Sequence, residues 1–410
     1  MKDIKIDILS LKTFLIFCMS PFFALPLVIW GIYRRHQASF IYLAFFMGLM
    51  AYLTPPVGDL YRHTMNYFNY QNTDFSHFIN DLRGDILLDF ISYVLARLRI
   101  PYDFVRLFYV TISYLILNRI FNWYIRYPDI PYSKKEAFIR YIFVFSGLLF
   151  FNLTLGVRFT FAAMLFLLSL HLYINCDKKG TAVFYLLLSV MTHYSMIAYC
   201  LFVLIFMCAH FNKSLTIIIL LAAARLSNIL MNIIEPYVTV TEFIGQGYLE
   251  DGKWGSGAGE YISPIKLLYY FICKIISCPI LLFCLRIYDR KDKWQNVLVS
   301  FFFLLFLLWP LQTLSDRTAQ ILLIISPLFL IYSENRSCKR ISGKYLTTLL
   351  LLWMFVYAGN IYGMDNPRAL SRYRHTLLPV PVIFSQHYEQ SWIMHNIDTD
   401  GLRRNATQKQ

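Results

Sequence analysis

Long apolar runs, separated by short charged or Pro/Gly-containing turns, dominate this sequence. A bilayer core of about 30 Å requires about 20 apolar residues in a spanning helix, and lipid-exposed backbone must pair its polar groups internally, which favours helices. The runs cover residues 11–33, 39–53, 104–125, 138–155, 157–174, 181–192, 194–210, 215–234, 265–288, 295–313, 318–332 and 345–362. The pattern predicts an all-α polytopic membrane protein with about 12 transmembrane helices, forming one integral domain over residues 1–410.

One segment between the second and third runs has a different pattern. In "DILLDFISYVLARLR" the apolar residues Ile86, Phe90 and Val94 recur at helical spacing, opposite Asp89 and Arg97. The segment is too short and too charged to span a bilayer. We expect an amphipathic helix lying in the outer interface, or a re-entrant helix that floors a cavity. A distorted span is the alternative, and it would reverse the side of every later loop.

Composition and charge support the membrane assignment. Hydrophobic residues make up 58% of the chain, and the net charge of +14 comes from 38 basic against 24 acidic residues. The basic residues concentrate in alternate loops, at 34–35, 126–135, 178–179, 213, 286–293 and 336–344. These loops are predicted to be cytoplasmic, which opposes the distorted-span alternative and explains the charge without a nucleic-acid partner. The loops 54–103 and 235–264, the tail 363–410 and both termini then lie outside, although Lys2, Lys5 and Lys12 oppose this placement of the N-terminus.

The cysteines and acidic residues suggest no cofactor. The eight cysteines fall in apolar runs or cytoplasmic loops, without CxxC or His/Cys spacing. They are best interpreted as buried apolar side chains, neither disulfides nor ligands. No cluster of carboxylates suggests a divalent cation, so we expect no metal site and no cofactor.

Several charged residues near the predicted outer ends of the helices are not explained by topology. "TPPVGDLYRH" follows the second run, where Pro55 and the glycine end the helix and bring Asp59, Tyr61, Arg62 and His63 to the membrane surface. These four are candidate site residues. An ordinary polar loop, with Asp59 capping the next helix, is the alternative interpretation.

Two further candidates are single residues at the ends of apolar runs. Arg158, in "NLTLGVRFTFAAMLF", opens a run without an acidic neighbour, and such a residue at membrane depth usually faces a cavity or a partner. Snorkelling to lipid headgroups is its alternative. His193 lies between two short runs, 181–192 and 194–210, whose helices would meet near the outer face. With an ordinary pKa near 6.5 it can accept a proton from a sugar hydroxyl, unless it only bonds neighbouring helices.

Arginines supply the remaining candidates. Asp316 and Arg317 lie at an outer junction of two runs and are expected to neutralise one another in part. After the last run, Arg368, Arg372 and Arg374 fall within seven residues. Planar guanidinium groups match phosphate oxygens two bonds at a time, so an anionic ligand accounts for them; anionic lipid headgroups are the alternative. Together these positions predict an outward-facing cationic cavity.

The same residues carry a family resemblance. "GDLYRHTMNY", "GVRFTFAAM" and "THYSMI", in this order, resemble the EpsG-like branch of Wzy-type O-antigen and exopolysaccharide polymerases over about residues 43–204. In that family a glutamine commonly follows the arginine, whereas here Phe159 follows. By the resemblance, Arg158 matches the family's arginine, His193 its histidine and Asp59 its acidic residue. Arg317, Arg372 and Arg374 are assigned by their chemistry alone.

The resemblance implies an enzyme of the bacterial inner membrane with its active site toward the periplasm. Its architecture would resemble that of the GT-C-like glycosyltransferases. Such a polymerase transfers a growing glycan from undecaprenyl pyrophosphate to the non-reducing end of a lipid-linked repeat unit. The expected partners are this lipid-linked oligosaccharide, membrane lipids and a chain-length regulator protein.

The expected reaction is an inverting displacement without a metal ion. His193 or Asp59 would deprotonate the acceptor hydroxyl, and arginines would stabilise the departing pyrophosphate. Three alternatives stay open: an O-antigen ligase that uses the same donor, a flippase for lipid-linked oligosaccharide, and a non-catalytic membrane scaffold. A scaffold would not need Arg158 and His193 both at outer helix ends.

Overall fold

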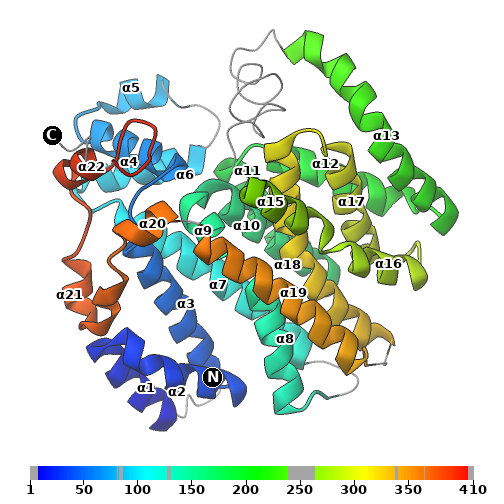
Figure 1. Ribbon diagram of the computed structural model, residues 1–410, viewed down its shortest axis with the longest axis horizontal. Helices are drawn as coiled ribbons and strands as arrows, with labels where there is room; N and C mark the ends of the chain where they lie inside the picture. Colours follow the sequence, from blue (N-terminus) through cyan, green and yellow to red (C-terminus); the bar gives the residue numbers. More distant parts are fainter. Residues whose placement is uncertain are drawn as a thin grey trace.

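The fold is helical, as the hydrophobic pattern predicts. A computed structural model describes residues 8–80, 82, 86–126, 131–238, 264–337, 340–363 and 365–404. The described segments form α-helices and short 3-10 turns, and the strand-like contact among them is an isolated bridge between Ile397 and Arg403 (Figure 1). Most of the expected loop 235–264 lies outside the described residues.

The helices have the following bounds in chain order. They are α1 (Ile8–Met19), α2 (Pro21–Tyr33), α3 (Gln37–Tyr52), α4 (Asp59–Tyr70), α5 (Phe75–Asn80), α6 (Ile86–Arg97), α7 (Asp103–Arg126), α8 (Lys134–Gly147), α9 (Phe150–Leu155), α10 (Val157–Asn175), α11 (Lys179–Thr192), α12 (Met196–Ala209), α13 (Lys213–Val238), α15 (Pro264–Ile275), α16 (Cys278–Arg286), α17 (Lys293–Leu307), α18 (Gln312–Ser337), α19 (Gly343–Tyr362), α20 (Asp365–Leu370), η2 (Tyr373–Leu377), α21 (Val380–Phe384) and α22 (Gln390–Asn396).

Within the described residues, five helical segments are long and apolar enough to cross a bilayer. They are Asp103–Arg126, Arg158–Asn175, Pro264–Arg286, Gln312–Ser337 and Gly343–Tyr362. Six shorter apolar helices cover further predicted runs. The chain is therefore a multi-pass membrane protein, while the count of twelve crossings stays a prediction.

The first predicted span, 11–33, is wrong as a single helix. It forms α1, of 12 residues, and α2, of 13 residues, which pack against each other. Ser20 has extended backbone and Pro21 begins α2, where the missing N–H of proline costs no helical hydrogen bond. Each helix is about 20 Å long, short of the 30 Å core.

The predicted span 138–155 is also divided. Helix α8 ends at Gly147, and Leu148 has extended backbone before α9 begins. The break lies where α8 meets α18: a Cβ on Gly147 would lie only 2.2 Å from the carbonyl oxygen of Leu323. Close packing of backbones through small residues is a common way to join helices in membranes, and here it requires glycine.

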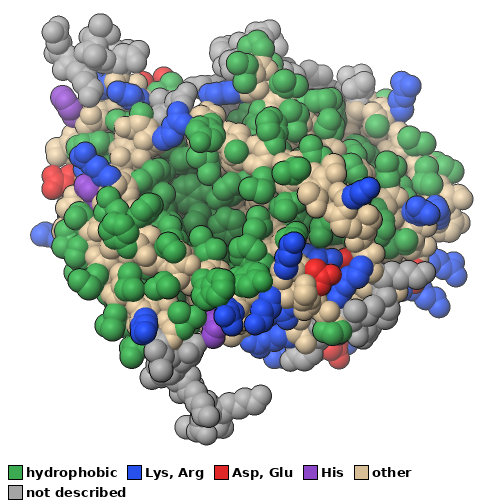
Figure 2. Space-filling view, turned by 60° about the horizontal axis from the view of Figure 1, so that its bottom comes forward, with side chains coloured by type: hydrophobic (Ala, Val, Ile, Leu, Met, Phe, Trp, Pro, Cys, Tyr) green, Lys and Arg blue, Asp and Glu red, His purple; other side chains and the backbone are tan. Residues whose placement is uncertain are grey.

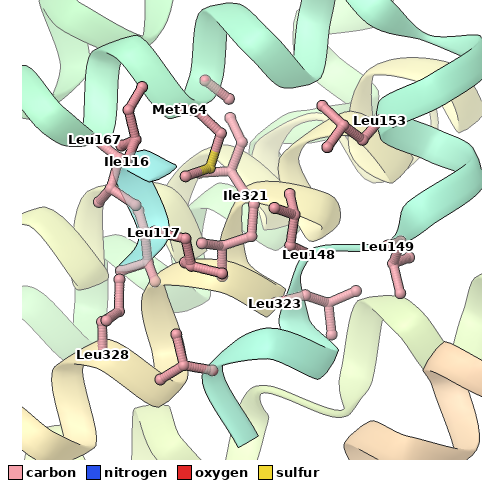
Figure 3. Packing of buried hydrophobic residues seen from close by; sticks show 14 of the residues in the cluster. Ile116, Leu117, Leu148, Leu149, Leu153, Met164, Leu167, Ile321, Leu323 and Leu328 are labelled. Atoms are coloured by element: carbon pink, nitrogen blue, oxygen red, sulfur yellow. The ribbon is translucent and has the colours of Figure 1, made fainter. Parts of the chain in front are cut away.

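The central core is built where α7, α10, α18 and the α8–α9 turn meet. Figure 3 shows their side chains interleaved, among them Leu117 of α7, Leu148 of the turn, Met164 of α10 and Leu323 of α18. All four are fully buried. The buried packing holds these long helices in place, and the candidate site residues lie near the ends of the helices.

Hydrogen bonds show which loops share one end of the molecule. The guanidinium of Arg35 donates to the carbonyl of Tyr132 at 2.5 Å, and Arg336 pairs with Asp289 at 2.7 Å. These contacts join four of the predicted cytoplasmic loops in two pairs, and the hydroxyl of Tyr132, which donates to Asn335 at 2.9 Å, links the pairs; we call the end that they form the basic end. Figure 2, with the bottom of Figure 1 turned forward, shows Lys and Arg side chains gathered there. The opposite end, where α3, α11 and α19 finish, is called the site end.

The segment predicted to be amphipathic forms helix α6 at the site end, and its position in the membrane interface stays a prediction. The helix buries Leu88 and Ser92 and packs against α4 and α11. On its other face Ile86, Phe90 and Val94 are 44%, 45% and 37% exposed, as expected for a helix with an apolar face in the membrane interface.

Candidate functional site

The site begins at a turn that only glycine accommodates well. Gly58 has φ of +62° and ψ of −135°, a conformation that side chains with a Cβ rarely adopt. Its N–H donates to the carbonyl of Gly401 at 2.9 Å, which ties the turn to the C-terminal tail. Helix α4 starts with the next residue, so this turn fixes the position of Asp59.

Asp59 collects three basic side chains around one carboxylate. Its Oδ1 accepts from Arg62 at 2.7 Å, its Oδ2 accepts from Arg158 at 2.9 Å, and the Nε2 of His63 lies 3.5 Å from Oδ2. The side chains of Asp59 and Arg158 are 39% and 19% exposed. The structure thus brings together four of the predicted site residues, from segments that lie far apart in the chain.

The charge state of Asp59 follows from this arrangement. Burial acts to raise its pKa, but the nearby imidazole of His63 and the positive charges of Arg158 and Arg62 together lower the pKa well below its usual range. Asp59 is therefore ionised at neutral pH, and Arg158 has a carboxylate partner before any ligand arrives.

His193 forms the turn between α11 and α12, as the two short apolar runs predict. The ring is 5% exposed and meets Phe159 edge to face, with 5.7 Å between the ring centroids. Its Nδ1 accepts from the backbone N–H of Ser195 at 3.4 Å, and the Ser195 hydroxyl lies 3.3 Å from the same atom. In the neutral ring this arrangement favours the tautomer with its proton on Nε2.

The surroundings of His193 change its acidity. Burial lowers its pKa to about 3, and the charges of Arg317 and Arg158 act in the same direction against a smaller opposing effect of Asp59. His193 is therefore neutral at physiological pH. The ordinary value near 6.5 that the sequence alone suggests does not hold in this environment.

Arg317 joins the site through an aromatic ring, and its expected partner is different. The Cζ of Arg317 lies 5.3 Å from the centroid of Phe159. Asp316 does not neutralise it: the Asp316 carboxylate lies 3.1 Å from Nζ of Lys274 and accepts from Gln312 at 2.9 Å. The prediction of an Asp316–Arg317 pair is corrected, because successive residues of a helix point in different directions.

Two residues near the site were not selected from the sequence. Phe159 lies between Arg317 and His193, which gives a role to the position where this chain departs from the expected glutamine. Asp89, from the amphipathic helix α6, lies close enough to the hydroxyl of Tyr102 to act on its pKa together with Arg158. A search for acidic residues on the inward face of an interface helix would have found Asp89.

In the described part of the chain, Tyr61, Arg372 and Arg374 form no hydrogen bond or ion pair with Asp59; they lie where the C-terminal tail packs against the helices. Tyr61 packs in a small apolar cluster with Tyr388. Arg372 donates to the carbonyls of Gln386 and His387 at 3.0 and 2.9 Å, and its Cζ lies 4.4 Å from the Tyr388 ring. These contacts fasten the tail to the helices, and they do not join Arg372 to Asp59. Arg374 is exposed.

The described His, Cys, Asp and Glu side chains bear on the expectation of no metal site and no disulfide. Among the residues that the structure describes, no three or more His, Cys, Asp or Glu side chains gather as a metal site would require. The described cysteines are all free thiols. The expectation of a metal-independent reaction stays a prediction.

The fold and the site together define a class. The chain is a multi-pass helical membrane protein that holds arginines, a carboxylate and a neutral histidine where its helices end. The model of the EpsG family matches residues 37–375, so the chain belongs to the EpsG family, which is linked to exopolysaccharide and glycan synthesis. The resemblance found in the sequence is confirmed, and the match extends well past residue 204. No curated protein and no solved structure matches the chain.

Proposed function

We propose that this protein is the polymerase of a surface polysaccharide. In this proposal it moves a growing glycan from undecaprenyl pyrophosphate to the non-reducing end of a lipid-linked repeat unit. The reaction takes place at the site end, which faces the periplasm of a bacterial inner membrane, within an architecture like that of GT-C glycosyltransferases. The lipid-linked oligosaccharide is the substrate, and a chain-length regulator is the expected protein partner.

The observation that carries the proposal is the shared carboxylate of Asp59. Arg158, only 19% exposed, donates to a carboxylate that Arg62 also uses, in a region that Arg317 makes more positive. A pyrophosphate offers several charged oxygens, and hydrogen bonds between charged groups are among the strongest in proteins. The donor can therefore replace Asp59 as the partner of Arg158. This exchange binds the leaving group and releases a carboxylate beside it.

The chemical step is then a displacement at the anomeric carbon. The acceptor hydroxyl oxygen forms a bond to that carbon on the face opposite the pyrophosphate, and the bond from the carbon to the phosphate oxygen breaks. Undecaprenyl pyrophosphate leaves with the electron pair, and the configuration inverts. Arg158 and Arg317 stabilise the charge that grows on the departing oxygens, a role that a metal ion has in other transferases.

The proton of the acceptor hydroxyl goes to His193 or to Asp59. Both are weak bases in the ligand-free site, because arginine charges contribute to lowering the pKa of each. The negative charge of the donor offsets these arginines, so the pKa of both groups rises when the donor is bound. His193 must also lose its contact with Ser195 before Nδ1 can accept a proton.

The glycan ladder of a deletion strain tests the function. Loss of long chains, with a single repeat unit still attached to its normal acceptor, is the result expected for a polymerase. Loss of that single unit as well would contradict the proposal and indicate a ligase or a flippase. Complementation by the wild-type chain restores the ladder, and complementation by Arg158→Ala at equal abundance does not.

A further inference from the structure

A cationic cavity lies at the basic end, far from the site end along the long helices. It has a volume of about 560 Å³, within the range of sites for small ligands. It lies between the start of α3, the last half of α7 and the turn from α10 to α11. Its charged lining residues are Arg119, Arg126 and Lys178, and none of the described residues that line it is acidic.

The polar face of α7 is what sets this cavity apart. Asn118, Arg119, Asn122, Trp123 and Arg126 follow one another at helical spacing, so they share one face of the helix. Asn118 is already satisfied, because it donates to the carbonyl of Phe40 at 2.9 Å and accepts from Tyr141 at 2.8 Å. Asn118 thus fixes the cavity wall, and the basic residues remain to meet a ligand.

The three basic side chains of the cavity are not paired with any described acidic residue. The side chains of Arg119, Arg126 and Lys178 form no hydrogen bond or ion pair with another described residue; the backbone N–H of Lys178 donates to the carbonyl of Leu172 at 3.0 Å. Arg126 and Lys178 are at the ends of their helices, where the excess of basic residues in cytoplasmic loops accounts for them. Arg119 is different, since it lies seven residues, or about 10 Å, inside the end of α7.

A charge at this depth is costly unless an anion or water reaches it. Ile41, on the wall of the cavity, is 55% exposed, so the cavity opens sideways toward the hydrocarbon region. Trp123 adds an amphipathic ring of the kind found at the level of lipid headgroups. A ligand that fits must carry negative charge at one end and hydrocarbon at the other.

We propose that this cavity binds the phosphate headgroup of an anionic phospholipid from the cytoplasmic leaflet. The phosphate lies between Arg119, Arg126 and Lys178, and one acyl chain follows Ile41 and Leu115. The inference does not rest on the proposed polymerase activity, because it concerns the opposite end of the molecule and a different ligand.

Native mass spectrometry of the full-length protein in detergent provides the test, with phosphatidylglycerol and phosphatidylcholine of equal chain length as probes. We expect the wild type to prefer phosphatidylglycerol and Arg119→Gln to weaken its binding at least 10-fold. The matched control is Lys135→Gln, which removes the same charge from an exposed position of α8 outside the cavity. Equal losses in both variants would mean that only general surface attraction is present, and the proposal would be wrong.

Two further measurements identify the source of the phosphate and keep the proposal testable if a variant does not fold. Millimolar inorganic phosphate should not displace the lipid; displacement would indicate a site for a soluble anion and overturn the proposal. In vesicles, brominated phosphatidylglycerol should quench the fluorescence of Trp123 more than brominated phosphatidylcholine does. The fluorescence of Trp123 is obtained by subtracting the signal of Trp123→Phe from that of the wild type. Equal quenching by both lipids would contradict the proposal even if Arg119→Gln failed to fold.

Discussion

Two arginine–carboxylate pairs at opposite ends of the protein differ in ways that separate structure from function. Arg140 of α8 donates to both oxygens of Glu334 in α18, at 2.7 and 2.5 Å, and the two side chains are 4% and 2% exposed. Tyr132 and the N–H of Ile341 also donate to Glu334. This pair is buried, matched in charge and saturated with hydrogen bonds.

The pair of Arg158 and Asp59 at the site end is arranged differently. A single 2.9 Å bond joins them, both remain partly accessible, and Arg62 donates to the other oxygen of the same carboxylate. A ligand cannot reach the buried Arg140–Glu334 pair without disrupting the fold. The Arg158–Asp59 pair is accessible, so a ligand can replace Asp59 as the partner of Arg158. Under the proposed function, the comparison predicts a folding role for Arg140 and a ligand-binding role for Arg158, and the following changes test that prediction.

Replacing Arg158 should have the largest effect on activity. Arg158→Ala is expected to abolish polymerisation, with a loss above about 10³-fold, because it removes the group that stabilises the leaving pyrophosphate. Arg158→Lys should recover little, since a point charge cannot reproduce a two-bond fork. Turnover of purified enzyme on lipid-linked repeat units measures both, with abundance in the membrane as the control. Normal activity of the alanine variant would mean that the Arg158 side chain only extends to the lipid headgroups and takes no part in the reaction.

His193→Ala should lower turnover by about 10²–10⁴-fold if the ring takes the acceptor proton, with donor binding nearly unchanged. His193→Gln keeps hydrogen bonding without a usable base, so it should be as inactive as alanine. A histidine that only supports the turn would be rescued by glutamine. Activity of the glutamine variant would leave Asp59 as the base.

The pH dependence tests the same residue independently. Only the neutral ring accepts a proton, so the rate falls as the pH drops through the pKa of His193, which burial lowers to about 3 before the donor binds. We expect kcat/KM to stay flat from about pH 8 to pH 5, since that parameter reports the free enzyme. The fall in kcat should begin at higher pH, because the bound donor raises the pKa. A fall in kcat/KM near the ordinary value of 6.5 would contradict the burial of this ring.

At the basic end, Arg140→Ala should affect stability and leave the chemistry intact. It leaves Glu334 buried without its partner, which costs about 3–5 kcal/mol in comparable pairs. Thermal unfolding in detergent and abundance in the membrane should both decrease, while activity per folded molecule is retained. The double variant Arg140→Met with Glu334→Met removes both charges and should regain most of the loss. Lost activity at normal stability would assign Arg140 to the site.

Gly58→Ala should have a smaller effect on stability, confined to the turn before Asp59. The residue has φ of +62°, and strain of this type costs about 1–3 kcal/mol. Displacement of Asp59 should also reduce activity. Gly180→Ala is the matched control, because a Cβ at Gly180 meets no atom within 4 Å. Equal thermal stability of the two variants would indicate that the turn tolerates a side chain.

Much of the fold could be predicted from local patterns, and the exceptions have identifiable causes. The amphipathic helix α6 and the turn at His193 follow from spacing along a single segment. The break at Pro21 was missed because hydrophobicity alone does not distinguish one long helix from two short helices. The pairing of Asp316 with Lys274, and the contacts of Arg372 with the carbonyls of Gln386 and His387, depend on how the chain returns on itself. Net charge and residue type could suggest an anion site, but only the packed structure shows which arginines are already engaged.

The binding of undecaprenyl pyrophosphate to the purified protein tests the exchange of partners most directly. If the donor replaces Asp59 on Arg158, Arg158→Ala should bind the lipid at least 10-fold more weakly. Asp59→Asn, in contrast, should bind it at least about 10-fold more tightly, because it removes a competitor whose charged hydrogen bond contributes about 1.5–3 kcal/mol. Turnover of Asp59→Asn should nevertheless fall if Asp59 is the base. Unchanged or weaker binding by Asp59→Asn, at normal stability, would contradict the exchange and would make the Arg158–Asp59 pair a structural one.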